Sequence, residues 1–146
     1  MIAAYAAALA DAGPGEAGVW QLEVLLQDTG HLQEAYDLRE RRIESLRASG
    51  DEARLQASLG NQALILKARG DLDGAMALLK EQERICRELG DPAGLATSLA
   101  NQGLLLVQTG RRGEGLALVE EAHETAAAHG LDALRQQIEP LLQQLR

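Results

Sequence analysis

The sequence lacks Phe and holds only one Trp, two Tyr and three Pro in 146 residues. Strands favour aromatic and β-branched side chains, so the scarcity of these residues argues against a β-protein. Leu and Ala, which are strong helix formers, supply most of the apolar content instead. A chain of this length is sufficient for one domain with a real core. The composition therefore predicts a single all-helical domain.

Basic residues and cysteines are also scarce. The chain has 14 Lys and Arg against 22 Asp and Glu, which gives a formal net charge of −8. A nucleic-acid-binding surface needs dense positive charge to neutralise phosphates, so the charge argues against nucleic acid as a partner and against binding to an anionic membrane. The single cysteine, Cys86, cannot form an internal disulfide, which is typical of a protein of the reducing cytoplasm.

No apolar run approaches the roughly 20 residues that a membrane-spanning helix needs. The first segment, MIAAYAAALADAG at 1–13, has no Lys or Arg before its apolar part, so it matches a secretory signal poorly. We expect an alanine-rich packing helix there. Gly13-Pro14-Gly15 ends that helix, because Gly adopts left-handed backbone and Pro cannot continue a helix.

The most informative feature that is present is a forty-residue repeat. The segment SLGNQALILKARG at 58–70 returns as SLANQGLLLVQTG at 98–110, and a weaker version, VWQLEVLLQDTG, occupies 19–30. Glycines keep the same step in two sets, Gly30, Gly70, Gly110 and Gly50, Gly90, Gly130. Such a period is typical of a solenoid, in which each unit buries its apolar face against its neighbours.

The period divides the chain into an N-terminal helix and three helix–Gly–helix repeats. We place the helix at 1–14, the repeats at 15–50, 51–90 and 91–130, and a C-terminal capping helix at 131–146. Apolar residues spaced by three and four predict one buried stripe on each helix. In repeat two the expected core residues are Leu55, Leu59, Ala63 and Leu66, followed by Leu72, Ala75, Leu78, Leu79, Ile85 and Leu89.

The helix junctions carry recognisable cap residues. Asp51, Asp71 and Asp91 each follow a Gly, so each is expected to cap the N-terminus of the next helix. Repeat three has Arg111 at this place, with no obvious cap. In the last segment we expect Asp132 to act as the cap, and Pro140 to kink the helix or delay its start.

Repeats two and three share Asn61/Asn101, Gln62/Gln102, Leu66/Leu106 and Gly70/Gly110. This pattern, LxNxAxxLxxxGD…A…L, resembles the tetratricopeptide repeat (TPR). The resemblance covers about residues 16–130. It is closest to the long-helix variety with repeats of about forty residues, as in kinesin light chain and the arms of bacterial signalling NTPases. Leu66 and Leu106 stand where that family usually has Tyr.

The resemblance implies an all-α fold, a right-handed α-solenoid of antiparallel helix pairs with a terminal capping helix. It also implies a protein- or peptide-binding scaffold or adaptor, within a larger bacterial signalling or regulatory protein, that binds its partner on the concave face. In that family the first helix of each repeat lines the concave face. The resemblance places on that face Trp20, Gln21 and Val24 in repeat one, Asn61, Leu64 and Lys67 in repeat two, and Asn101, Leu104 and Gln108 in repeat three.

The residues themselves give these positions two interpretations. Asn61 and Asn101, one repeat apart, can each donate to and accept from the backbone of an extended peptide. The alternative is that each Asn bonds to a neighbouring loop or side chain, and the sequence favours neither. Leu64 and Leu104 suit either the floor of a groove or packing against the next helix, and packing is the commoner role. Trp20 suits a binding hot spot, although a lone Trp more often packs in part against the core.

Catalysis and metal binding are not expected. His31, His123 and His129 lie far apart in sequence, and neither His-x-x-x-His nor Cys-x-x-Cys spacing occurs. Cys86 lies on the core side of its helix, which predicts a buried structural thiol. We therefore expect no enzyme activity and no cofactor. The alternative to a binding adaptor is a module that self-associates into homo-oligomers through a first repeat left uncovered by residues 1–13.

Overall fold

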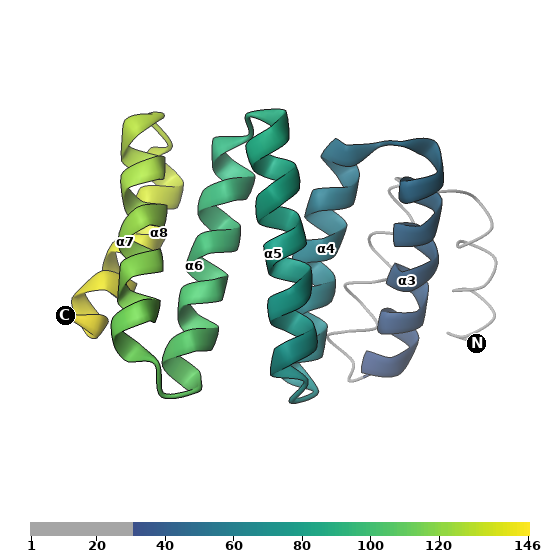
Figure 1. Ribbon diagram of the computed structural model, residues 1–146, viewed down its shortest axis with the longest axis horizontal. Coiled ribbons are helices and arrows are strands. Elements are labelled where there is room, and N and C mark those ends of the chain that lie inside the picture. The colour runs from purple at the N-terminus through teal and green to yellow at the C-terminus, as the bar shows by residue number, and fades with distance from the viewer. Residues whose placement is uncertain (1–30) are drawn as a thin grey trace.

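The computed structural model describes residues 31–146, and this part of the chain is all-helical, with no strand. The helices are α3 (Leu32–Ser49), α4 (Glu52–Ala68), α5 (Leu72–Leu89), α6 (Pro92–Gln108), α7 (Arg112–Ala128) and α8 (Asp132–Leu145). Figure 1 shows them as a row in which each helix lies beside the next one in the chain. The predicted all-α fold is confirmed for this part. The predictions for 1–30, which include Trp20, Gln21 and Val24, lie outside the described residues.

Glycine and aspartate form the helix junctions as predicted. Gly50 and Gly90 end α3 and α5 with φ of 73° and 68°, a left-handed conformation that costs glycine little. The Asp51, Asp71 and Asp91 side chains each accept a hydrogen bond from the backbone N–H three residues later, at 3.2, 2.9 and 3.0 Å. The caps therefore fix where α4, α5 and α6 begin.

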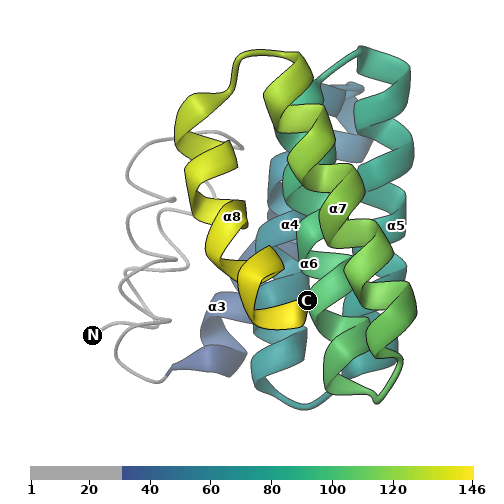
Figure 2. The same cartoon turned by 90° about the vertical axis from the view of Figure 1, so that its left-hand side faces the viewer.

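The last helix departs from its prediction. Leu131, not Asp132, is the N-cap of α8, because the Leu131 carbonyl already accepts a hydrogen bond from Arg135 N at 2.9 Å. Pro140 does not delay the helix, since α8 runs through it. Gln136, whose carbonyl would bond the missing N–H of Pro140, is exposed, so water can take that place. Figure 2 shows the last turns of α8 running in a different direction from its first turns.

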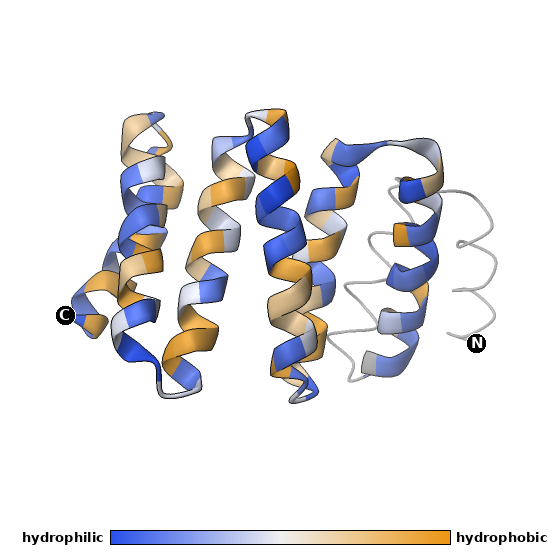
Figure 3. Ribbon diagram, viewed as in Figure 1, coloured by the Kyte–Doolittle hydropathy of each residue, from blue (hydrophilic) through white to orange (hydrophobic). Residues whose placement is uncertain are grey.

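The core follows the predicted stripes with one exception. Hydrophobic and hydrophilic residues alternate along every described helix (Figure 3), and the hydrophobic ones pack between neighbouring helices. Leu55, Leu59, Ala63 and Leu66 of α4 are all buried, as expected. Leu89 was expected in the core but is 46% exposed, because it lies in the last turn of α5, immediately before Gly90.

Helices α6 and α7 approach each other through a pair of glycines. A Cβ atom placed on Gly103 would lie 2.7 Å from the Gly115 carbonyl oxygen, and one on Gly115 would lie 2.5 Å from the Gly103 carbonyl oxygen. The equivalent residues of repeat two are Ala63 and Ala75, which are both buried. Repeat three therefore has no room for the methyl groups that pack between α4 and α5.

Two ion pairs join every second helix at matching positions of the repeat. Arg47 of α3 donates to Glu81 of α5, with Nη2–Oε2 at 2.9 Å, and Arg87 of α5 donates to Glu121 of α7 at 3.1 Å. Both members of the second pair lie forty residues after those of the first. The pairs are largely exposed, so each stabilises the fold only modestly, but they show that α3, α5 and α7 share one register.

Candidate functional site

A surface hollow between α4 and α6 collects part of the predicted binding face. Its volume is about 310 Å³. It is lined by Gln56, Ala57, Gly60, Asn61 and Leu64 of α4, by Gln82 of α5, and by Asp91, Ala93, Gly94, Thr97 and Asn101 at the start of α6 and along it. We call this hollow the α4–α6 groove. Four of the lining residues, Ala57, Gly60, Ala93 and Gly94, are small.

Three of the predicted residues meet in the groove. Asn61 and Asn101 are half-buried, and neither side chain bonds to another residue within 31–146. Leu64 is 39% exposed at the groove, so it is not simply a packing residue. The remaining predicted residues of α4 and α6 do not line the groove; they lie further along the same helices and are Lys67, Leu104 and Gln108.

The floor of the groove holds a chain of polar side chains that the sequence analysis missed. Gln82, which is 3% exposed, donates from Nε2 to Gln56 Oε1 at 3.0 Å. Gln56 in turn donates from Nε2 to Asp91 Oδ2 at 3.1 Å, and the Cys86 thiol also donates to Gln56 Oε1, at 3.3 Å. These contacts join α4, α5 and the start of α6 beneath the groove.

The direction of this chain follows from the chemistry of its ends. An ionised carboxylate only accepts hydrogen bonds, so Asp91 turns the Gln56 amide nitrogen toward itself. Gln56 Oε1 then faces Gln82. Because this oxygen only accepts, the Gln82 amide turns its nitrogen toward Gln56. Gln82 Oε1 is left at the far end, buried and without a hydrogen-bond partner among the described residues. The groove floor therefore contains an unused acceptor.

Two glycines leave room for these side chains. A Cβ atom on Gly60 would lie 2.8 Å from Gln82 Nε2 and 2.9 Å from its Oε1. One on Gly94 would lie 2.6 Å from Cys86 Sγ and 2.7 Å from Asp91 Oδ2. Gly60 lies in the middle of α4, where glycine is unfavourable, and Gly94 lies in the first turn of α6. The position of Gly60 is the sequence signal that a close tertiary contact exists here.

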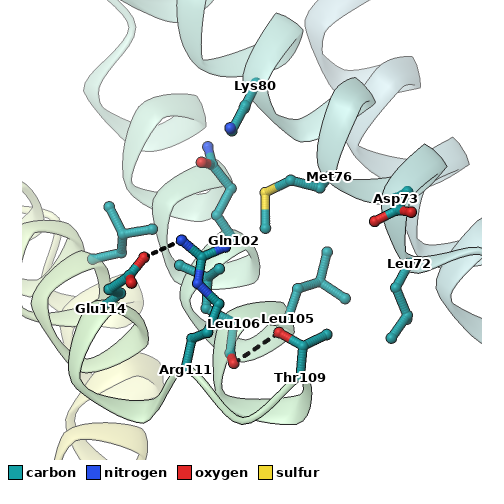
Figure 4. Close-up of a pocket in the computed structure, with 11 residues that line it drawn as sticks. Leu72, Asp73, Met76, Lys80, Gln102, Leu105, Leu106, Thr109, Arg111 and Glu114 are labelled. Atoms are coloured by element: carbon teal, nitrogen blue, oxygen red, sulfur yellow. Dashed lines mark hydrogen bonds and ion pairs between the residues drawn. The ribbon is translucent and has the colours of Figure 1, made fainter.

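A second hollow of about 320 Å³ lies between α5, α6 and α7 (Figure 4). Met76, Leu105 and Leu106 give it an apolar lining, and an ion pair between Arg111 and Glu114 closes one side. The Thr109 hydroxyl donates to the Leu106 carbonyl oxygen at 3.0 Å. Arg111, Glu114 and Thr109 already have partners within the protein, whereas Asp73 and Lys80, which also line this hollow, have none among the described residues.

The Cys86 side chain is fully buried, as predicted. Burial, with a further contribution from the Asp91 charge, raises the pKa of the Cys86 thiol to about 12, so it is a neutral hydrogen-bond donor and not a nucleophile. Within residues 31–146, no group of three or more His, Cys, Asp and Glu side chains is placed to hold a metal ion. None of the helices in that range is both long and apolar enough to cross a bilayer.

Neither a protein-family model nor a curated protein matches this chain. The resemblance of the repeats to the TPR family therefore stays a prediction.

Proposed function

We propose that this chain is a protein- or peptide-binding adaptor, a TPR-like right-handed α-solenoid that holds an extended segment of its partner along the α4–α6 groove. The proposal depends on one observation. Asn61 and Asn101, one repeat apart, lie at the same hollow with amide groups that no other described residue uses. Free amides at a groove suit an occupant that presents both donors and acceptors, as a peptide backbone does.

The spacing of the two amides fits an extended chain. Asn61 and Asn101 hold the same position of the repeat in α4 and α6, and both line the one hollow. An extended peptide rises about 3.3 Å per residue, so a short segment would cross this hollow. Asn61 and Asn101 would then contact its backbone, and Leu64 would contact one of its side chains. The family resemblance implies that such an adaptor is part of a larger signalling or regulatory protein. The single cysteine favours the cytoplasm, and we propose binding without catalysis.

The test uses peptides selected from a random displayed library against the full chain. Changing Asn61 and Asn101 to Ala together is expected to weaken binding of a selected peptide about tenfold or more, because each amide loses its hydrogen bonds to the peptide. Thermal unfolding should be unchanged, since neither amide bonds to a described residue. The matched control changes Lys67 and Gln108 to Ala, which lie on the same helices outside the groove.

Two results would contradict the proposal. One is a double Asn variant that binds selected peptides as tightly as the parent chain does. The other is a groove occupied by a second copy of the chain, which light scattering would report as a dimer that the Asn variant loses. That second result would favour the self-association module.

A further inference from the structure

We propose that the α4–α6 groove takes a basic side chain, Lys or Arg, of the bound peptide, held by Gln82 Oε1 and the Asp91 carboxylate. This inference rests on the proposed function and adds the chemistry of the partner to it. Both acceptors belong to residues that line the groove, and no Lys, Arg or His lines it.

Gln82 supplies the first argument. Its side chain is almost completely buried, and its Oε1 has no hydrogen-bond partner among the described residues. A buried acceptor without a partner is unfavourable, so a protein that keeps one at a groove gains when an occupant brings a donor. A reversed Gln82 amide would place its Oε1 against Gln56 Oε1, and the hydrogen bond between the two side chains would be lost. Gln56 cannot reverse in turn, because its Nε2 donates to Asp91.

Asp91 supplies the second argument and selects a charged donor over a neutral one. Its two oxygens accept from Gly94 N and Gln56 Nε2, which are both neutral groups. Asp91 forms no ion pair with another residue of 31–146. The half-buried carboxylate therefore has no cationic partner among these residues, and the N-terminus of α6, which it caps, offsets only part of its charge, within a chain of net charge −8. A guanidinium or ammonium group would provide both the donors and the opposite charge.

The shape of the groove fits a long side chain. Ala57, Gly60, Ala93 and Gly94 line part of it, so a side chain can lie against these small residues. The volume of about 310 Å³ is large enough for the aliphatic stem and the charged head together. Asn61 and Asn101 stand at the same hollow, where they would contact the peptide backbone that carries the side chain.

The first experiment probes the subsite without a peptide. Ethylguanidinium is titrated into the full chain, and nitrogen–proton NMR follows the side-chain amides of Gln56, Gln82, Asn61 and Asn101. Ethylurea has nearly the same shape but no charge, and a carbonyl oxygen replaces one of the NH2 groups, so it also has fewer donors. We expect saturable shifts with ethylguanidinium, binding about tenfold weaker with ethylurea, and about tenfold weaker binding in Gln82→Met. Shifts scattered over the acidic surface, or equal binding of the two probes, would overturn the inference.

Gln62→Met is the matched control for Gln82→Met. Gln62 is also a fully buried glutamine whose Oε1 has no described partner, but it does not line the groove. Its Nε2 donates to the Tyr36 carbonyl and to Glu40 Oε1. Both variants remove one buried amide and keep an unbranched side chain. If Gln62→Met weakens ethylguanidinium binding as much as Gln82→Met does, the effect comes from altered packing and the inference falls.

The second experiment separates this inference from the proposed function. Library-selected peptides should share a Lys or Arg at one position. Replacing it by norleucine or citrulline should weaken binding about tenfold to the parent chain and little to Gln82→Met or Asp91→Asn. If the peptides depend on Asn61 and Asn101 but show no basic residue, the adaptor stands and the basic subsite falls. If no peptide is selected, the adaptor falls, and the ethylguanidinium titration alone decides the subsite.

Discussion

Two junctions in this chain have the same helical plan and opposite chemistry. The junction of α4, α5 and α6 contains Gln56, Gln82, Cys86, Asp91 and Gly94. Forty residues later, the junction of α6, α7 and α8 has Ala96, Ala122, Ala126, Leu131 and Leu134 at the same places. The second set packs into one apolar cluster with Ile138, Leu142 and Leu145. The fold can therefore close this position with apolar residues alone.

The difference indicates what each junction does. Burying polar groups is unfavourable unless they are hydrogen-bonded, whereas an apolar cluster stabilises the fold through the area it removes from water. The apolar junction holds α8 against the end of the row. The polar junction buries less apolar area and is stabilised less in this way. It also leaves Gln82 Oε1 without a hydrogen-bond partner among the described residues. We attribute Gln56 and Gln82 to recognition because the second junction packs without such residues, whereas Asp91 also has a structural role as the N-cap of α6.

The largest effect is expected from breaking the apolar junction. Leu142 is 2% exposed within the cluster, so Leu142→Ala should leave a cavity and lower the free energy of unfolding by about 2–5 kcal/mol. Urea unfolding measures this loss, and affinity for a selected peptide should stay within about twofold at a temperature where the variant is folded. A variant that keeps its stability, or that loses peptide binding while folded, would show that the two junctions do not have separate roles.

The next effect comes from removing the space beneath the groove. Gly94→Ala would place a methyl group 2.6 Å from Cys86 Sγ and 2.7 Å from Asp91 Oδ2, so we expect a loss of about 1–3 kcal/mol. The same junction position in the apolar set is Leu134, which is half-buried in its cluster. Thermal unfolding checks the loss, with Gly113→Ala as the control, because a methyl group there meets no atom within 4 Å. If the two variants were equally stable, a methyl group at Gly94 would not collide with Cys86 and Asp91, which would contradict this prediction.

A smaller change in stability is expected from making the floor less polar. Gln56→Leu combined with Gln82→Met removes both partners of one part-buried hydrogen bond together, which by itself is often nearly neutral. The change also removes the hydrogen bonds of Gln56 with Asp91 and the Cys86 thiol, so we expect a loss of about 1–2 kcal/mol. The affinity for peptides should nevertheless fall about tenfold. Urea unfolding and peptide titration of the same preparation test both statements. A large loss of stability would mean that the polar chain is needed for packing, contrary to the comparison of the junctions.

The smallest effect concerns the ion pair that joins α3 to α5. The hydrogen bond from Arg47 lowers the pKa of the Glu81 carboxyl below 4.5. The Glu81 pKa is lower in the folded state than in the unfolded state. The ion pair therefore stabilises the fold above pH 4.5, and this stabilisation is lost as the pH falls through the pKa of the folded state. Arg47 is nearly half exposed, so we expect less than about 1 kcal/mol. Acid unfolding of the parent chain and Glu81→Gln tests this, and equal acid sensitivity would contradict it.

Much of the fold could be predicted from the sequence because its determinants are local. The Asp51, Asp71 and Asp91 caps and the buried stripe of α4 depend on residues within a turn or two. Leu89 was wrongly placed in the core, although the end of α5 at Gly90 was predicted, because the apolar spacing does not show that no neighbouring helix covers the last turn. Of the two outcomes expected for Pro140, a delayed start is wrong because α8 runs through it.

The candidate site was predicted only in part. Asn61, Leu64 and Asn101 could be found because the repeat places them at equivalent positions of neighbouring helices. Gln56, Gln82 and Asp91 were missed because their hydrogen bonds join residues 26 and 35 positions apart. No periodicity marks such a contact. Gly60 was the only local sign, since glycine in the middle of a helix calls for a reason in the packing.

The most direct test exchanges one junction for the other. The apolar set is transplanted onto the polar junction as Gln56→Ala, Gln82→Ala, Cys86→Ala, Asp91→Leu and Gly94→Leu, and affinity for a library-selected peptide is measured alongside thermal unfolding. We predict a folded helical protein that is less stable by about 1 kcal/mol, because α6 loses the Asp91 cap, and that binds the peptide at least tenfold more weakly. A folded protein with unchanged affinity would contradict the assignment of the groove, and a chain that fails to fold would contradict the claim that packing does not need the polar residues.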